Sequence, residues 1–142
     1  MKAINFGRVI LGGLVAGIVN NILEYLVNDV IMKADHETAM KALGKLVPTG
    51  GSVAATWTIM GFVFSIAVVW LYAAIRPRYG AGVGTAVRAG VAFWFFSSVF
   101  FAVIVWNLTL LPFSPMQLLL ELIVAVITSF VGAWLYREEA TA

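Results

Sequence analysis

Polar residues interrupt the first long apolar run of the chain, GLVAGIVNNILEYLVND at positions 13 to 29. Asn20, Asn21, Glu24 and Asn28 carry amide and carboxyl groups, which can hydrogen-bond, exchange a proton or bind a cation. A carboxylate inside a bilayer costs at least about 2.5 to 3.5 kcal/mol, so such a group is functional by default or is paired. The chemistry therefore depends on what these groups contact.

Helical spacing places these polar groups on the same side as two glycines. At about 100° per residue, one narrow face holds Gly13, Gly17, Asn20, Glu24 and Asn28. Gly13 and Gly17 form a GxxxG pair, which lets another helix backbone approach closely. We expect this face to be buried against protein, with its polar groups bonded across helices.

Two later apolar runs repeat this design. Glu121 shares a face with Ala125, Thr128 and Gly132, and a weaker seam in the second run consists of Ala54, Thr58, Gly61 and Ser65. Seams that face inward predict a compact helical bundle. The predicted close-packing positions are Gly13, Gly17, Gly61 and Gly132. The predicted buried polar cluster is Asn20, Asn21, Glu24, Asn28, Glu121 and Thr128.

The composition identifies an integral membrane protein. Of 142 residues, 62% are hydrophobic and 11% are charged, against about 25% charged in a typical soluble domain. The nine basic and seven acidic residues lie almost entirely between the apolar runs, which argues against a nucleic-acid partner. The chain has no cysteine, so disulfides, thiolate metal sites and cysteine nucleophiles are excluded.

Four segments reach the length of about 20 residues that spans about 30 Å of hydrocarbon. They are 9 to 32, 53 to 75, 87 to 110 and 116 to 136, which predicts a single all-α transmembrane four-helix bundle over 1 to 142. The prolines of LPFSP at 111 to 115 are expected to end the third helix and start the fourth. The first helix is expected to be retained, because polar residues occupy the place of a signal-peptide cleavage site.

The distribution of basic residues predicts the orientation. Six of the nine Lys and Arg residues lie at the two termini and around the second connection, and the first connection holds only Lys33, Lys41 and Lys45. The positive-inside rule then places both termini in the cytoplasm. Arg88, one turn into the third span, is expected to snorkel to the cytoplasmic surface.

The first connection, 33 to 52, is long enough to form a short helix at the outer interface. Met40, Leu43 and Val47 recur in it at helical spacing, with Lys41 and Lys45 turned elsewhere. We therefore expect a short interfacial helix in this connection.

The orientation also sets the depth of the two carboxyl groups. The first span runs outward and reaches Glu24 late, whereas the fourth runs inward and meets Glu121 early, so both are expected in the outer half of the bilayer. As neighbours they would share a proton or a cation. In the structural alternative, Glu24 is protonated or bonded to Asn28 or Lys33, and Glu121 is wetted at the interface.

The third span contains FWFFSSVFF at 93 to 101. Its aromatic residues are Phe93, Trp94, Phe95, Phe96, Phe100 and Phe101. No single face can hold all of them, so some should contact lipid, a partner protein, or a flat apolar ligand such as a quinone, carotenoid or chlorophyll. No cofactor is predicted, and bound lipid or pigment is compatible with this surface.

Other patterns indicate little chemistry. His36 is the only histidine, so no second histidine completes a metal site with its acidic neighbours. The glycines of YGAGVGTA at 79 to 86 lack the preceding strand and the lysine of a phosphate-binding loop. No Ser, His and Asp combination lies at a common depth, so we expect no enzyme and no metal.

Three stretches resemble an uncharacterised family of small four-span bacterial integral membrane proteins. They are RVILGGLVAG at 8 to 17, WLYAAIRPRYGAGVGTA at 70 to 86 and GAWLYRE at 132 to 138. The resemblance covers nearly the whole chain and implies four helices in the bacterial cytoplasmic (inner) membrane. It implies no activity, ligand or catalytic residue. Small multidrug transporters share only the layout of four spans with a Glu in the first.

Three functions are compatible with these features. The thin polar content favours a non-catalytic accessory subunit of a larger membrane complex, of respiratory or photosynthetic type, docked through the aromatic third helix and the connection 33 to 52. The alternative is a small proton- or cation-coupled transporter in which Glu24 and Glu121 alternate between protonated and ligand-bound states. The third is a binder of an apolar ligand at the third span. The expected partners are the lipid bilayer and either other membrane subunits or further copies of the chain.

Overall fold

The structure, a computed structural model, describes residues 3–108 and 110–138. Every regular element in these residues is helical, which confirms the all-α prediction. Four helical segments are long and apolar enough to cross a membrane: Phe6–Ile31, Gly51–Tyr79, Val83–Asn107 and Pro115–Leu135. Their ends lie within about one turn of the predicted ends, so the chain has the architecture of a multi-pass membrane protein.

Two of the spans contain a π-helical segment. In the first span, α1 (Phe6–Tyr25) continues into η1 (Leu26–Ile31). In the third, α4 (Val83–Trp94) continues through η2 (Phe95–Val99) into α5 (Phe100–Asn107). A π-turn holds more residues than an α-turn, so the constant 100° spacing used on the sequence fails beyond Tyr25.

The other two spans are α3 (Gly51–Tyr79) and α6 (Pro115–Leu135). α6 begins as the sequence predicts, with Pro115 in its first turn and the Ser114 hydroxyl accepting from the Gln117 backbone N–H at 3.3 Å. The prediction that α3 ends at residue 75 is wrong. Pro77 lies so near the end of the helix that it disrupts only the last turn. The helix continues through Pro77 and stops at Gly80, whose φ is +81°.

The short helix predicted in the first connection is present as α2 (Lys33–Ala42). It ends earlier than the apolar spacing indicated, because Gly44 adopts a φ of +67° directly after the last turn. Val47 therefore lies outside the helix.

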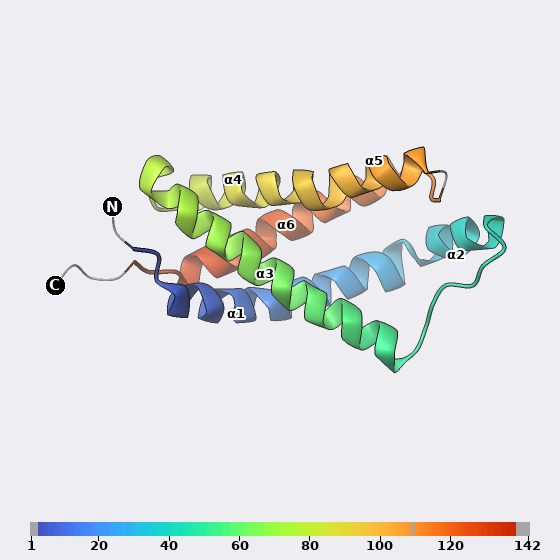
Figure 1. Cartoon of the computed structure of the whole chain (residues 1–142), viewed down its shortest axis with the longest axis horizontal. Helices are drawn as coiled ribbons and strands as arrows, with labels where there is room; N and C mark the ends of the chain where they lie inside the picture. Colours follow the sequence, from blue (N-terminus) through green and yellow to red (C-terminus); the bar gives the residue numbers. More distant parts are fainter. Residues whose placement is uncertain (1–2, 109, 139–142) are drawn as a thin grey trace.

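The four spans form a ring in which each helix packs against two neighbours (Figure 1). α1 contacts α3 and α6, and α4 contacts the same two helices. α3 also contacts α6 across the middle. Near the two chain ends the Asn5 backbone N–H donates to the Tyr136 hydroxyl at 3.3 Å, so both ends lie at one end of the bundle, called here the terminal end. The opposite end, which carries α2, is called the α2 end.

Glycines make the close helix crossings possible. A Cβ on Gly12 would lie 2.8 Å from the carbonyl oxygen of Gly132, and one on Gly90 would lie 2.9 Å from that of Ala125. The four glycines that the sequence singled out also lie at crossings: Gly13 against Ile66, Gly17 against Phe62, Gly61 against Asn21, and Gly132 against Val69 and Ala16. The absence of side chains at these points sets the helix separation.

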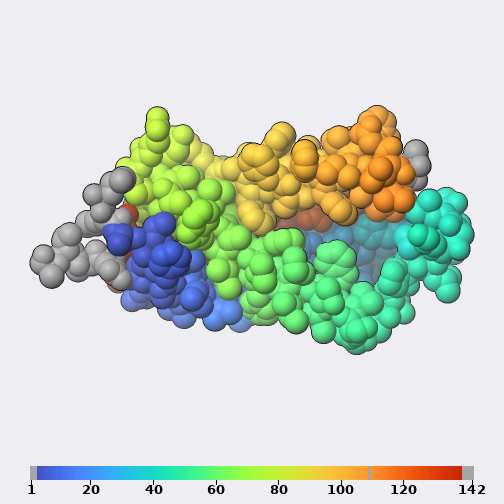
Figure 2. All heavy atoms as spheres, in the orientation of Figure 1, coloured from blue at the N-terminus to red at the C-terminus, as the bar shows by residue number. Residues whose placement is uncertain are grey.

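Packing is dense at the terminal end and looser at the α2 end. The main core cluster includes Val9, Ala16, Val68, Val69, Tyr72, Ala73, Ala86, Ala89 and Tyr136. Toward the α2 end a smaller cluster of Val27, Met32 and Val124 joins η1 to α6. There α3 diverges, and it makes no contact with η2 or α5, all of which lie in the described residues. Figure 2 shows the resulting hollow between α3 and the η2–α5 segment, with α6 and η1 at its floor.

Replacing Gly12 by alanine tests the central crossing. The added methyl group would meet backbone rather than a movable side chain, so we expect Gly12→Ala to lower stability by about 1 to 3 kcal/mol. Gly51→Ala is the matched control, because nothing lies within 4 Å of a Cβ there. Thermal unfolding in detergent should show a lower midpoint for Gly12→Ala only. Equal midpoints for Gly12→Ala and the wild type would contradict the close approach.

Candidate functional site

The two membrane-embedded carboxyl groups meet. The side chains of Glu24, in the last turn of α1, and Glu121, in the second turn of α6, lie close enough to interact directly. Asn28 in η1 supports the pair, since its Nδ2 donates to Glu24 Oε2 at 2.8 Å. Two helices thus contribute one acidic pair, with an amide bonded to Glu24.

This pair has no basic partner within the described residues. Neither Glu24 nor Glu121 forms an ion pair there with a lysine, arginine or histidine. Two like charges so close together repel strongly in a low-dielectric site, so a proton or a cation must lie between them. Lys33, a candidate partner for Glu24 on the sequence, is exposed at the start of α2 instead.

The pair lies on the helices that form the floor of the hollow. α1 stays in contact with α3 as far as Asn21, whose Nδ2 lies 3.3 Å from the Thr58 carbonyl oxygen, and Glu24 follows about one turn later. α3 has diverged at that level, and its residues 54 to 59 are exposed. Glu24, Asn28 and Glu121 are accordingly half-buried rather than sealed. The helices that carry the carboxyl groups therefore form the floor of an opening in the α2-end half of the bundle (Figure 2).

The predicted polar cluster separates into three contacts. Glu24, Asn28 and Glu121 form the acidic pair with its amide. One turn toward the terminal end, the Thr128 hydroxyl donates to Asn20 Oδ1 at 3.1 Å, and both side chains are buried. Asn21 does not join the cluster, because it lies on the adjacent side of α1 and donates to the Gly17 and Thr58 carbonyl oxygens.

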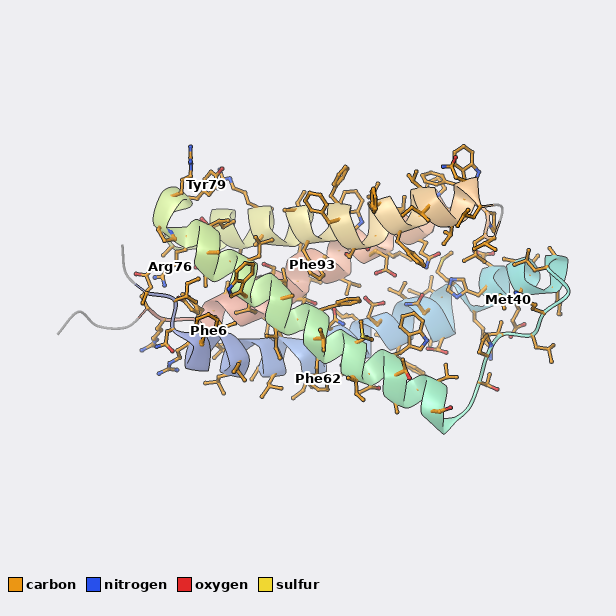
Figure 3. All side chains as sticks on the ribbon, viewed as in Figure 1. Phe6, Met40, Phe62, Arg76, Tyr79 and Phe93 are labelled. Atoms are coloured by element: carbon orange, nitrogen blue, oxygen red, sulfur yellow. The ribbon has the colours of Figure 1, made fainter. Side chains whose placement is uncertain are left out.

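The aromatic residues of the third span also separate. Phe93 makes an edge contact with Phe64 of α3 at 5.8 Å between ring centroids, and Figure 3 shows Phe93 on the side of α4 that faces α3. The Trp94 indole N–H donates to the Leu118 carbonyl oxygen at 2.8 Å. These two side chains therefore belong to the bundle rather than to a docking surface. Four others are exposed: Phe95, Phe96, Phe100 and Phe101.

One packing seam was missed on the sequence. α4 buries Thr85, Ala86, Ala89 and Gly90, and the Ser129 hydroxyl of α6 donates to the Ala86 carbonyl oxygen at 2.7 Å. The signal was present, because Thr85 with Ala89 and Ala86 with Gly90 are small residues at i, i+4 spacing. The adjacent aromatic residues concealed it.

Within residues 3–108 and 110–138, no three His, Asp or Glu side chains lie close enough together to hold a metal ion. The Nε2 of His36 lies 3.5 Å from the amide Oε1 of Gln117, and this contact connects α2 to the start of α6.

Comparison with known proteins found no matching protein family, curated protein or solved structure. The resemblance to small four-span bacterial membrane proteins therefore stays a prediction, and the functional argument depends on the geometry alone.

Proposed function

We propose that this protein is a small proton- or cation-coupled membrane transporter that uses Glu24 and Glu121 as its binding pair. The observation that carries the proposal is the close approach of these two carboxyl groups, from separate helices and without a basic partner in the described residues. A purely structural polar contact needs only neutral groups, as the Asn20 and Thr128 pair shows one turn away. A carboxyl pair in a bilayer is costly unless a proton or cation is bound.

The arrangement suits exchange between a proton and a cation. With a proton between them, the two carboxyl groups carry one negative charge instead of two. The Asn28 amide stabilises that charge by donating a hydrogen bond to Glu24. A cation that enters the hollow can replace the proton, because the carboxylate oxygens then coordinate it directly. Protons and cations compete for the same oxygens, so cation binding should strengthen as the pH rises.

The proposal places the hollow on the outer side of the bacterial cytoplasmic membrane, with both termini in the cytoplasm. The basic residues support this orientation through the positive-inside rule. The segment that holds Asn28, η1, is π-helical, and such segments are frequent at functional sites.

Proton release on cation addition tests the pair directly. Purified protein in weakly buffered detergent, with a pH-sensitive dye, is titrated with Na⁺ and with tetraphenylphosphonium, an inorganic and a lipophilic organic cation. We expect the wild-type protein to release protons with at least one of them, because the cation displaces the shared proton. Glu24→Gln and Glu121→Gln should abolish the release, since each removes one titratable group.

Asp35→Asn is the control, because Asp35 is an exposed carboxylate on α2 outside the pair. It should release protons as the wild type does, and melting temperatures should show that the Gln variants remain folded. No release from the wild type with either cation, or full release from both Gln variants, would show that the pair is structural.

An accessory subunit of a larger membrane complex is the second candidate. It is supported by the third span, in which 11% of an apolar 18-residue stretch is buried within the bundle, against 33% for such a stretch in each of the first two spans. Its outward aromatic residues provide a large contact surface for another subunit or a further copy of this chain. A flat apolar ligand at the same surface would co-purify as a coloured or redox-active species.

Phe96→Ala distinguishes assembly from packing. Phe96 is 72% exposed, so its truncation should change stability by less than about 0.5 kcal/mol while reducing the mass of any complex extracted in mild detergent from the native host. Phe130→Ala on α6 is the matched control, because it removes another exposed ring from a different span. Trp94→Ala should instead lower the melting temperature, since it leaves the Leu118 carbonyl without its donor. A wild-type protein that migrates as a free monomer would contradict the accessory role.

A further inference from the structure

The basic residues that the structure describes are divided by type between the two ends. All five arginines lie at the terminal end: Arg8, Arg76, Arg78, Arg88 and Arg137. Among the described residues, the α2 end holds every lysine, Lys33, Lys41 and Lys45, together with Asp29, Asp35 and Glu37. The α2 end is therefore balanced in charge, whereas the described part of the terminal end has Glu138 as its only acid.

One arginine has a structural role inside the terminal end. Arg76 Nε lies 3.7 Å from Glu138 Oε1, and its guanidinium group lies over the Tyr136 ring at 5.5 Å from the centroid. Figure 3 shows Arg76 at this end of α3. The other four arginines are exposed and form no ion pair within the described residues.

Arg88 is held in a defined position near the membrane surface. It lies one turn inside the third span, yet its guanidinium group folds back toward the start of α4, with Nη1 3.2 Å from where a Cβ on Gly84 would lie. The same group lies 5.2 Å from the centroid of the Tyr79 ring. The cation–π contact orients the guanidinium group while the side chain stays exposed.

The surroundings of Arg88 are apolar on one side and basic on the other. Val87 and Val91, its neighbours on α4, are exposed. Toward the chain ends, Arg78 adjoins Tyr79 in the last turn of α3, and the first turn of α4 carries no acid. A phosphate group bound here would have acyl chains beside it, which a soluble anion lacks.

We propose that Arg88, Arg78 and Tyr79 bind the phosphate diester of an anionic membrane phospholipid, whose acyl chains lie along Val87 and Val91. A guanidinium group donates to two phosphate oxygens at once, which a lysine ammonium cannot match, and the segregation of arginine to this end fits that geometry. Tyrosine at the membrane interface places its ring at the headgroup level. This site is independent of the carboxyl pair.

Lipid retention tests the proposal. The full-length protein is equilibrated in detergent with phosphatidylglycerol or with phosphatidylcholine of the same acyl chains, and native mass spectrometry measures the fraction of protein that retains lipid. We expect phosphatidylglycerol to be preferred, and Arg88→Gln and Arg78→Gln each to weaken its retention about five-fold, the effect of about 1 kcal/mol per basic residue near an anionic surface. Arg88→Lys should restore only part of the retention, because it returns the charge without the paired donors.

Lys41→Gln and Lys45→Gln are the matched controls, since they remove the same charge at the α2 end. They should leave retention unchanged, and if they reduced it equally, the binding would reflect net charge only and the proposal would fail. Equal retention of the two lipids would overturn it as well. Displacement of the lipid by millimolar inorganic phosphate would show a site for soluble anions instead. Should Arg88→Gln fail to fold, Arg88→Lys and Arg78→Gln decide the matter.

Discussion

The bundle depends on the close approach of three helices around Gly12 and Gly132. At this crossing the Gly12 position faces the Gly132 carbonyl oxygen, and Val69 of α3 fills the space that a side chain on Gly132 would need. In a bilayer, lipid competes equally for apolar side chains, so association depends on close van der Waals contact and on hydrogen bonds between helices. The residues that provide both are concentrated in the terminal half of the molecule, where the main core cluster lies.

This tight half leaves the other half open. α3 crosses α1 at the glycines and then diverges, so it cannot cover the face that α1 and α6 present toward the α2 end. Glu24 and Glu121 lie close together on these two helices, and the Asn28 amide bonds to Glu24. A rigid crossing beside a half-buried polar pair suits a binding site, because the crossing fixes the two helices that carry the carboxyl groups.

The sequence predicts the elements well, because apolar length, turn residues and small-residue spacing are local properties. The four spans, the helix start at Pro115 and the helix after Lys33 all follow from it, as do four of the glycine positions at crossings, but not Gly12 and Gly90. The acidic pair could be suspected from depth alone, but its contact could not, since that depends on how α1 and α6 are oriented. The π-helical segments and the inward direction of Trp94 also escaped prediction, because neither has a local signature stronger than the surrounding apolar pattern. Two of the six aromatic residues considered for a partner or ligand surface, Phe93 and Trp94, contact neighbouring helices instead.

The central claim is that Glu24 and Glu121 share a proton that a cation can replace. Infrared difference spectroscopy of the purified protein measures it most directly, because a protonated carboxyl group has a carbonyl stretch distinct from that of a carboxylate. Near neutral pH without added cation, we expect a protonated-carboxyl band that is altered in both Glu24→Gln and Glu121→Gln and that disappears when a bound cation displaces the proton. A spectrum with both carboxyl groups ionised in the absence of added cation, or a band unaffected by either substitution, would show that the two groups share no proton.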